Sequence, residues 1–465
     1  MFRRSDNPEL FKALCSQYKT LCPQDKTVDM LFTKELTDEQ LSKITTLTIK
    51  PSTFANVKSL NGIEQLTNLE HLSIAGQSAR THAREFEETR KRAEVVMGYN
   101  PESDYQYFAD EFESGQLTDI TPIYSLKKLK SLSLANQRGI AEFDFSHNSN
   151  LTNVDMRDCR GLKKISGLHT LKVIQDPSQL EDKFAYFDSR FDFSGCCSLR
   201  SVGSMTKLAE TLSKNREADN LDDHIFLPTT AYCHIVREEP QVGEILNDME
   251  HNGCIDVAKW TEIGEGGVRI QNNSRQMAIA KRYADETVRT LFYGQNPSPL
   301  DKVSGVYRWI CDNIKYDYNG LELSEKEDRN KKYRKTDQIR SSYVALIDKK
   351  AVCVGISNLF NFFMADLGYS AEPVSCSSVT SEDARMTISN HQMSKVFINN
   401  STYYCDPTWD LGSSESRYFC LNKKEMGRDH QFTVADLKVQ SGESYQEILR
   451  KAGLLKTKTN GVQME

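Results

Sequence analysis

The chain has 465 residues and a formal net charge of −6 at pH 7, so it is long enough for two or three domains that each bury a core. The small negative charge gives no electrostatic footprint for nucleic acid, and we expect no nucleic-acid partner. No apolar run approaches the roughly 20 residues that a membrane-spanning helix needs, so we expect no membrane partner either.

The 12 cysteines are scattered singly, apart from Cys196-Cys197, and no Cys-x-x-Cys pair is present. In a chain of this length without a secretory signal, such cysteines are expected to stay thiols. The nine histidines do not cluster with cysteines at the spacing of zinc ligands, so we predict no metal and no cofactor. The first residues are basic but no apolar stretch follows them, which predicts a cytoplasmic protein, with delivery by a non-classical route as the alternative.

Residues 1–40 are predicted to form an N-terminal helical cap, with helices over 8–18 and 37–44. A repeat of apolar residues then runs through 41–205. Leu47 precedes Leu72 by 25 residues, and Leu151 follows Leu129 by 22, so the repeated unit has 22–25 residues. The spacing 3, 3, 3, 3 and 2 occurs twice, in Leu60, Ile63, Leu66, Leu69, Leu72 and Ile74 and again in Ile120, Ile123, Leu126, Leu129, Leu132 and Leu134.

A unit of this length with the pattern Leu-x-x-Leu-x-Leu predicts one short strand per unit, stacked into a solenoid. The pattern resembles the short leucine-rich repeats of bacterial proteins, whose units read like residues 117–123. A longer motif, Phe143-Asp144-Phe145-Ser146, recurs 48 residues later from Phe191, and we interpret this offset as two units.

Other stretches interrupt or follow the repeat. Residues 77–116 are highly charged and are interpreted as a solvated insertion, with a contact arm for a partner as the alternative. Residues 206–264 form a connecting region, in which 226–236 is predicted to be a strand or a capping element. Ser298-Pro299 predicts a helix start. We expect a second domain at 265–430 and a C-terminal extension at 431–465.

Cys353 is predicted to lie at the start of a helix. From Ile356 the apolar positions follow the spacing i, i+3, i+4, i+7, i+8 and i+11, which predicts an amphipathic helix packed on a core. Gly368 stands where such a helix ends. The unpaired N–H groups and the helix dipole at this start stabilise a thiolate, and Gly355 is expected to leave room for a substrate backbone.

A hairpin is predicted to carry the partners of this cysteine. Residues 391–398 and 402–406 are strand-like, and Asn399-Asn400 between them is a turn signal. If these two residues form the loop, Met393 lies opposite Asp406. His391 and Asp406 then share one face as diagonal neighbours, within side-chain reach. A thiol, an imidazole and a carboxylate are the parts of a nucleophile, its base and the group that orients the base.

These segments resemble the transglutaminase-like superfamily, which has a papain-like cysteine fold and is common in bacterial proteins. The resemblance covers about 275–430 and includes 307–317, which looks like the helix that precedes the catalytic cysteine. One departure is that Gln392 and Met393 follow the histidine, where the family usually has an aromatic residue. The matching motifs are Ser342-Tyr343-Val344-Ala345-Leu346, Lys350-Ala351-Val352-Cys353-Val354-Gly355, Asn390-His391 and Tyr403-Tyr404-Cys405-Asp406-Pro407-Thr408-Trp409-Asp410.

The resemblance implies a cysteine-dependent acyl-transfer enzyme with an α+β catalytic domain. Cys353 is expected to be the nucleophile, His391 its base and Asp406 the group that orients His391. The thiolate would attack a glutamine side chain or a peptide bond and form a thioester, with a backbone N–H at the helix start serving the oxyanion. Water would then make the protein a cysteine protease or deamidase, and an amine a transglutaminase; the alternative function is a non-catalytic interaction scaffold with an idle domain.

Neighbouring residues are given structural roles. Trp409 and Asp410 are expected to close the hairpin against the core. Tyr343 is expected to pack, with a contribution to an oxyanion hole as the alternative. Cys376 and Cys405 are near the site but lack a base, so we expect them to be packing residues.

The predicted fold class is therefore mixed, α/β and α+β, with a leucine-rich-repeat solenoid followed by an α+β transglutaminase-like domain. Repeat arrays offer wide surfaces suited to proteins, so we expect a protein substrate or partner on the repeats. Its contacts are predicted at Thr48, Ser73, Ser133 and Asp155, which lie between apolar positions of their strands and therefore point to the opposite face. The alternative is that the solenoid only orients or covers the catalytic domain.

Overall fold

The structure, a computed structural model, describes the chain from residue 1 to residue 431 with gaps. The described ranges are 1–29, 32–49, 57–74, 115, 117–175, 191–203, 205–214, 225–251, 258–263, 269–326, 335–382, 385–399 and 401–431. The charged segment at 77–116, apart from Gly115, and the C-terminal extension after residue 431 therefore lie outside the described residues. Within these ranges, no helix combines the length and the apolar character that crossing a membrane requires.

The N-terminal part begins with the two helices that the sequence predicts. Helix α1 (Pro8–Leu21) starts at Asn7, whose side chain accepts a hydrogen bond from the N–H of Leu10, and Pro8 occupies the first helical position. Helix α2 (Asp38–Ser42) starts at Thr37 with a capping box. Strands β1 (Phe2–Arg3) and β2 (Glu35–Leu36) pair antiparallel beside them.

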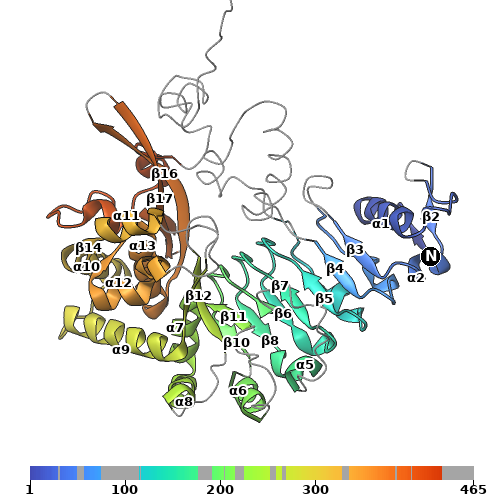
Figure 1. The fold of residues 1–465 in the computed structure, drawn as a ribbon, viewed down its shortest axis with the longest axis horizontal. Coiled ribbons are helices and arrows are strands. Elements are labelled where there is room, and N and C mark those ends of the chain that lie inside the picture. Colours follow the sequence, from blue (N-terminus) through green and yellow to red (C-terminus); the bar gives the residue numbers. More distant parts are fainter. Residues whose placement is uncertain are drawn as a thin grey trace, which may run out of the picture.

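An eight-stranded sheet runs along the molecule in the order β13-β12-β11-β9-β7-β5-β4-β3 (Figure 1). Its neighbouring strands pair in parallel, except that β12 and β13 are antiparallel. The strands are β3 (Thr46–Thr48), β4 (His71–Ser73), β5 (Ser131–Ser133), β7 (Asn153–Asp155), β9 (Phe191–Asp192), β11 (Ile225–Pro228), β12 (Lys259–Ile263) and β13 (Arg269–Asn272).

The register of this sheet follows the spacing of the repeat. Leu47 stands opposite Leu72, Leu72 opposite Leu132, and Leu132 opposite Val154. All four side chains are buried, and each such burial contributes about 1.5–3 kcal/mol. The sheet also continues past residue 205, because β11 and β12 of the expected connecting region pair in parallel with it.

A second sheet of three parallel strands has the order β10-β8-β6 and lies beside the first. Its strands are β6 (Glu142–Asp144), β8 (Lys164–Ser166) and β10 (Ser201–Val202). Phe143 belongs to this sheet, whereas Phe191 belongs to the large one. The interpretation of the 48-residue offset as two equivalent units is therefore wrong: the two phenylalanine motifs resemble each other in sequence but enter different sheets.

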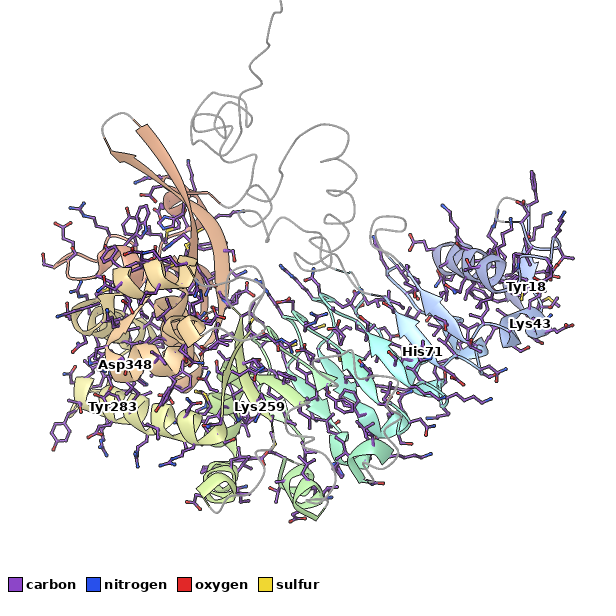
Figure 2. All side chains as sticks on the ribbon, viewed as in Figure 1. Tyr18, Lys43, His71, Lys259, Tyr283 and Asp348 are labelled. Atoms are coloured by element: carbon purple, nitrogen blue, oxygen red, sulfur yellow. The ribbon has the colours of Figure 1, made fainter. Side chains whose placement is uncertain are left out.

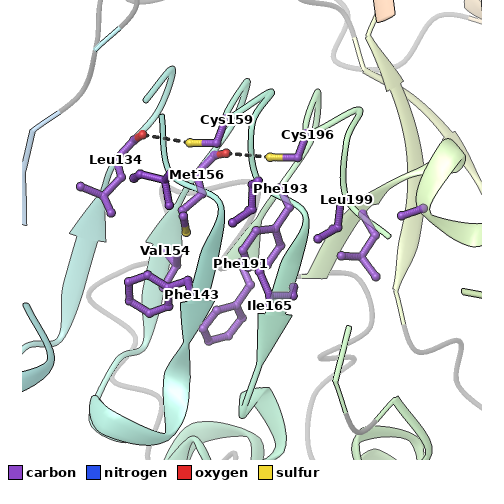
Figure 3. Close-up of a cluster of buried hydrophobic side chains, with 14 of the residues drawn as sticks. Leu134, Phe143, Val154, Met156, Cys159, Ile165, Phe191, Phe193, Cys196 and Leu199 are labelled. Carbon is purple, nitrogen blue, oxygen red and sulfur yellow. Dashed lines mark hydrogen bonds between the residues drawn. The ribbon is translucent and has the colours of Figure 1, made fainter. Parts of the chain in front are cut away.

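The core of the repeat region lies between these two sheets. Figure 3 shows Val154 and Phe191 from the large sheet with Phe143 and Ile165 from the small one. Two thiols complete the packing: Cys159 donates to the carbonyl of Leu134 at 3.1 Å, and Cys196 donates to that of Met156 at 3.1 Å. Each thiol is a second donor to a carbonyl that already accepts a backbone N–H, that of Gln137 at 3.2 Å for Leu134 and that of Cys159 at 3.4 Å for Met156.

Short helices fill the connections of the repeat region. The one-turn segments are η1 (Ile63–Gln65), η3 (Thr121–Ser125), η4 (Phe145–His147) and η5 (Leu168–Thr170). The α-helices are α5 (Lys172–Gln175), α6 (Met205–Lys214), α7 (Thr229–Glu238) and α8 (Pro240–His251). The apolar segment at 226–236 is thus divided between strand β11 and helix α7.

The C-terminal part packs helices against a four-stranded antiparallel sheet of order β18-β17-β16-β19. The sheet contains β16 (Ser370–Glu382), β17 (Arg385–Ile398), β18 (Ser401–Cys405) and β19 (His430–Gln431). The longer helices of the C-terminal part are α9 (Ser274–Leu291), α10 (Pro299–Asn313), α11 (Tyr318–Lys326), α12 (Ser342–Asp348) and α13 (Cys353–Asp366). Shorter elements are β14 (Lys315–Tyr316), η10 (Lys335–Arg340), β15 (Lys350–Ala351), η11 (Pro407–Asp410) and α14 (Lys423–Met426).

Helix α10 starts as the sequence predicts, because Ser298 accepts from the N–H of Asp301 and Pro299 is the first helical residue. In the described part of the chain, side chains lie between the helices and the sheets (Figure 2). The fold is mixed α/β with several sheets.

The two parts of the molecule meet where the large sheet reaches β16 (Figure 1). Arg160 lies 3.6 Å from the carboxylate of Glu372, and Arg200 donates to the hydroxyl of Ser370 at 2.6 Å. Glu372 is buried and also contacts Lys395. Burial raises the pKa of Glu372, but the charges of Arg160 and Lys395 lower it by more. The net effect is a pKa below the ordinary value, which favours the charged carboxylate. An ion pair and a charge-assisted network thus connect the repeat region to the C-terminal sheet.

Candidate active site

Cys353 is the first residue of helix α13, where the sequence places it, and Val352 precedes it as the N-cap. Every residue of this helix is buried, so the expectation of one apolar stripe is wrong. The physical reason is that α13 is a central helix: α12, α7, α10 and strands β16 and β17 all contact it. Gly368, with φ +89°, ends the segment as predicted.

Gly355 has a packing role rather than the predicted role in substrate access. A Cβ atom at this position would lie 2.5 Å from the carbonyl oxygen of Ile339 and 2.8 Å from the Cβ of Ala351. The glycine therefore lets η10 and β15 approach the first turn of α13 closely. Cys353 itself has a relative exposure of 7%, so its thiol lies just beneath the surface of this packed region.

The predicted hairpin forms with the predicted register. Ile398 stands opposite Ser401 and Ser394 opposite Cys405, so the chain reverses between Ile398 and Ser401. Asn399 has φ +50°, a left-handed conformation that asparagine tolerates. The register places Asp406 one step past β18, diagonal to His391 on β17, and the two side chains meet: Nε2 of His391 lies 2.6 Å from Oδ2 of Asp406.

The structure brings the three predicted site residues together. The ring of His391 hydrogen-bonds to the Asp406 carboxylate, with Nε2 2.6 Å from Oδ2, and the Cys353 thiol lies near enough to act on the imidazole. Since Nε2 faces Asp406, Nδ1 is the nitrogen left for the thiol. Burial lowers the pKa of His391, but the charge and hydrogen bond of Asp406, together with Cys353, raise it well above its ordinary value. The Asp406 carboxylate therefore favours the protonated form of the imidazole.

A second histidine, His430, lies on the other side of Asp406. Its Nε2 is 2.9 Å from Oδ2 of Asp406, and its Nδ1 is 2.7 Å from Oδ1 of Asp429. Both His430 and Asp406 have 0% relative exposure. Burial raises the pKa of Asp406, but the two histidines hold it well below its ordinary range. Sequence reasoning missed His430; the adjacent Asp429-His430 pair at the end of the expected domain was its only signal.

Asp406 has a complete set of hydrogen-bond partners. Its Oδ1 accepts a hydrogen bond from the backbone N–H of Thr408 at 3.0 Å. Its Oδ2 forms hydrogen bonds with Nε2 of His391 and Nε2 of His430. The residue is also the N-cap of η11, the turn that follows β18. These contacts fix the carboxylate in one orientation.

Trp409 and Asp410 close the hairpin, as the sequence predicts. Asp410 is buried and accepts hydrogen bonds from the Tyr307 hydroxyl and from the N–H of Tyr418 at 2.9 Å. The ring of Trp409 lies 4.4 Å from that of His430 and 6.0 Å from that of His391, centroid to centroid. The tryptophan therefore packs directly on the histidines of the site.

His391, Asp406 and His430 are also a group that could hold a metal ion, since their ligand atoms lie within 4.8 Å of one another. Their separations of 2.6 and 2.9 Å are those of hydrogen bonds. Each ring nitrogen that faces Asp406 is a donor to a carboxylate, and metal binding would have to displace both protons. We therefore interpret the group as a hydrogen-bonded network.

The remaining candidates near the site are packing residues. Cys376 stands opposite His391 in the β16–β17 register and is buried with Met393. Cys405 is buried, and its sulfur lies 3.8 Å from that of Cys420. Tyr343 is half-buried against the core. Gln392 turns toward α13, where its amide donates to Asn358 at 3.3 Å.

A cavity of about 70 Å³, lined by both polar and apolar surface, lies at the junction of the two parts of the molecule. It is lined from the repeat region by residues such as Arg160, Thr230 and Glu262, and from the C-terminal part by Asn361 and Gln392. Both side-chain atoms of Asn361 are buried without a hydrogen-bond partner. Ordered water fits a cavity of this size and polarity.

The chain matches no family model and no curated protein. Among solved structures, it is similar to a transglutaminase, with 15% identity and a TM-score of 0.24 over 41% of this chain and 42% of that one. It is similar to a candidate cysteine protease from Cytophaga hutchinsonii, with 14% identity and a TM-score of 0.21 over 28% and 38%. It is also similar to internalin C2 from Listeria monocytogenes, with 15% identity and a TM-score of 0.20 over 50% and 82%. The chain thus spans less than half the length of the transglutaminase and of the cysteine protease. These similarities are too distant to assign a function, so the chemistry of the site is inferred from the contacts of its own residues.

Proposed function

We propose that the protein is a cysteine-dependent acyl-transfer enzyme of the transglutaminase-like type, with Cys353, His391 and Asp406 as its catalytic residues. The observation that carries the proposal is the buried pair of His391 and Asp406, whose side chains lie 2.6 Å apart and whose imidazole lies near the Cys353 thiol at the start of α13. This is the arrangement of a nucleophile, its base and an orienting group. Cys353 lies at the start of α13, whereas His391 and Asp406 lie on the β17–β18 hairpin, so two separate segments of the sequence supply the three residues.

The reaction begins with attack of the Cys353 sulfur on a substrate carbonyl carbon. The first-turn N–H groups of α13 have no acceptor within the helix, so they can hold the negative oxygen that develops. The proton on His391 passes to the leaving amine as the carbon–nitrogen bond breaks, and a thioester remains. Water or an amine then attacks this thioester, with His391 accepting the proton of the incoming group.

Asp406 keeps the imidazole in place throughout these steps. Its carboxylate accepts the Nε2–H of His391, so Nδ1 is directed at the sulfur. Because Asp406 is fully buried and charged, its attraction for the imidazolium is not screened by water. The pair is therefore preorganised for proton transfer to and from His391.

We further propose that the repeats are a solenoid that binds the protein substrate. Thr48, Ser73, Ser133 and Asp155 are aligned in one row across four neighbouring strands. A row of polar side chains opposite the buried leucines is a surface on which a protein segment can lie. The contacts of Arg160 with Glu372 and of Arg200 with Ser370 favour the alternative, in which the repeats orient the catalytic domain.

The proposal is tested by incubating the full chain with a glutamine-containing protein and a fluorescent primary amine. Mass spectrometry of the substrate distinguishes the three outcomes: an amine on glutamine means transglutaminase, glutamate in its place means deamidase, and new chain ends mean peptidase. Each product must disappear with Cys353→Ser.

The burial of Cys353 supports a second function, that of a scaffold with an idle domain. Iodoacetamide separates the two functions without knowledge of the substrate. If the protein is an enzyme, iodoacetamide should alkylate Cys353 faster than the other cysteines, and this selectivity should be lost when His391 is replaced. Equal, slow labelling of the buried cysteines would establish the scaffold and contradict the enzyme.

A further inference from the structure

His430 has an arrangement of partners that requires two protons on its ring. Nε2 faces Asp406 at 2.9 Å and Nδ1 faces Asp429 at 2.7 Å, and both partners are carboxylate oxygens. A carboxylate oxygen only accepts, so both ring nitrogens must donate, and a ring with two N–H groups is an imidazolium. Asp429 is itself oriented by Tyr418, whose hydroxyl donates to its other oxygen at 2.8 Å.

Three aromatic side chains hold this ring in one orientation. The centroid of His430 lies 4.4 Å from Trp409, 5.4 Å from Tyr418 and 5.4 Å from His391. The backbone is fixed as well, because His430 on β19 stands opposite residue 378 of β16. A cation packed on the face of an aromatic ring is stabilised by the ring electrons. The site thus contains a buried, oriented cation that the proposed reaction does not use.

We propose that His430 is a positioning residue: a permanent imidazolium, anchored by Asp429, that holds Asp406 in place from the side opposite to His391 and adjusts how strongly His391 keeps its proton. This inference rests on the proposed function and adds a fourth and a fifth residue to it. The chain of contacts runs from Asp429 through His430 and Asp406 to His391 and ends at the Cys353 sulfur.

The charges explain the adjustment. His391 and His430 share one oxygen of Asp406, so each cation weakens the hold of Asp406 on the other. Burial lowers the pKa of His430, and Asp406 and Asp429 raise it above its ordinary value, whereas the charge of His391 lowers it. The effect is reciprocal, so the charge of His430 lowers the pKa of His391. The titratable groups that face His430 are Asp406, Asp429, Tyr418 and His391.

Two substitutions separate the charge of His430 from its hydrogen bonds. In His430→Gln the side-chain amide reaches the position of Nε2, so a donor to Asp406 remains while the charge is lost. In His430→Asn the amide reaches only the position of Nδ1, so the contact with Asp429 remains and that with Asp406 is lost. His234→Gln is the matched control, because His234 is also fully buried but neither of its ring nitrogens has a hydrogen-bond partner among the described residues.

The measurement is the rate of Cys353 alkylation by iodoacetamide against pH, with the full chain, together with kcat and KM for acyl transfer. Loss of the His430 charge leaves Asp406 to hold the His391 proton more strongly, so both His430 variants should move the inflection of the alkylation profile that reports His391 to higher pH, by about one unit. In kcat, His430→Asn should lose about 10–100-fold and His430→Gln clearly less, with KM unchanged in both. The control should keep the wild-type profile.

A purely structural His430 predicts a different result. Both variants would then lower the melting temperature but keep the wild-type alkylation profile and kcat, which would overturn the inference. If one variant fails to fold, the profile of the other still decides. Failure of the proposed function has its own signature, since Cys353 would then show no selective, His391-dependent alkylation in the wild-type chain.

Discussion

Glu262 and Ser342 meet across 80 positions of sequence: Oε2 of Glu262 accepts the backbone N–H of Ser342 at 2.9 Å. Glu262 lies near the end of β12 in the large sheet, and Ser342 is the first residue of α12 in the C-terminal part. The other carboxylate oxygen of Glu262, Oε1, accepts a hydrogen bond from the hydroxyl of Thr229, the first residue of α7. One buried carboxyl thus accepts the first backbone N–H of α12 and the hydroxyl of the first residue of α7, and it ties the two parts of the molecule together.

This contact makes stability depend on pH. Burial raises the pKa of Glu262 to about 7, although Ser342 and Thr229 partly oppose the rise. Between the ordinary value of 4.5 and about 7, the folded chain keeps a proton that the unfolded chain has lost. Stability therefore falls as pH rises through this window and stays lower above it, by about 3 kcal/mol at most. Chemical denaturation from pH 4.5 to 8 should show a smaller fall in Glu262→Gln.

Glu372→Gln is the control for that prediction because the sign is opposite. The pKa of Glu372 is lowered by Arg160 and Lys395, so its contribution is present above the ordinary value and is lost as pH falls. The substitution should destabilise the chain near neutral pH and matter less in acid. The same pH dependence in both variants would contradict the roles assigned to the two carboxyls.

Cys353→Ser should abolish acyl transfer while the chain stays folded. The substitution keeps the volume of the side chain, but a hydroxyl beside His391 is a far poorer nucleophile than a thiol. Because Cys353 is buried rather than placed in an open cleft, an alanine there would leave a small void, and serine is the cleaner variant. We expect at least a thousandfold loss of kcat and a change in stability within about 1 kcal/mol, measured by product formation and urea unfolding.

Asp406→Asn should reduce kcat on the order of a thousandfold, more than any change at His430. The asparagine cannot attract two imidazolium rings, so His391 loses both its orientation and its charge partner. Removal of a buried anion between two cations should also destabilise the fold by about 3–5 kcal/mol. Asp410→Asn is the control, since Asp410 is an equally buried carboxylate on the same turn that contacts Tyr307 and Tyr418 instead. That variant should lose stability but keep the alkylation profile of Cys353.

Gly355→Ala should destabilise the chain by about 1–3 kcal/mol, despite the better helix propensity of alanine. The new methyl group would lie 2.5 Å from the rigid carbonyl oxygen of Ile339. Gly305→Ala in α10 is the matched control, because its methyl group would meet the ring of Phe292, which can move. Equal stability of the two variants in urea unfolding would mean that the first turn of α13 is not tightly packed.

Substrate capture by the repeats predicts a selective effect of Ser73→Arg and Ser133→Arg. These residues stand opposite each other in the row on β4 and β5. A bulky cation there should raise KM for a protein substrate about tenfold and leave iodoacetamide labelling of Cys353 unchanged. Ser125→Arg, at an exposed position on η3, is the control. An unchanged KM in all three variants would favour the repeats as a scaffold that only orients the catalytic domain.

A truncation near Glu262, which the expected domain limits suggest, is a poor test of the same question. Such a cut would divide β12 and remove its parallel partner β11. It would also remove Arg160 and Arg200, which contact the C-terminal sheet. Loss of activity would then report lost packing rather than lost capture, so the point variants are preferable.

Much of the candidate site follows from the sequence by local rules. The helix start at Cys353 and the turn at Asn399 each depend on a few adjacent residues, because capping and turn geometry are set by neighbouring backbone groups. Once the turn is placed, the period of two along a strand fixes the diagonal of His391 and Asp406. The register of Leu47, Leu72 and Leu132 follows in the same way from the repeat length.

Only the tertiary structure decided what surrounds these elements. The burial of every face of α13 and the closeness of Ile339 to Gly355 depend on which elements pack there, and no periodicity encodes that choice. His430 reaches Asp406 from 24 positions away through a strand of two residues, too short for a sequence pattern to reveal. The contact between Glu262 and Ser342 likewise joins residues 80 positions apart, and no local sequence pattern predicts it. Local hydrogen bonding determines where a helix or a turn begins, whereas long-range contacts depend on the free energy of burying whole surfaces together, which no single segment of the chain specifies.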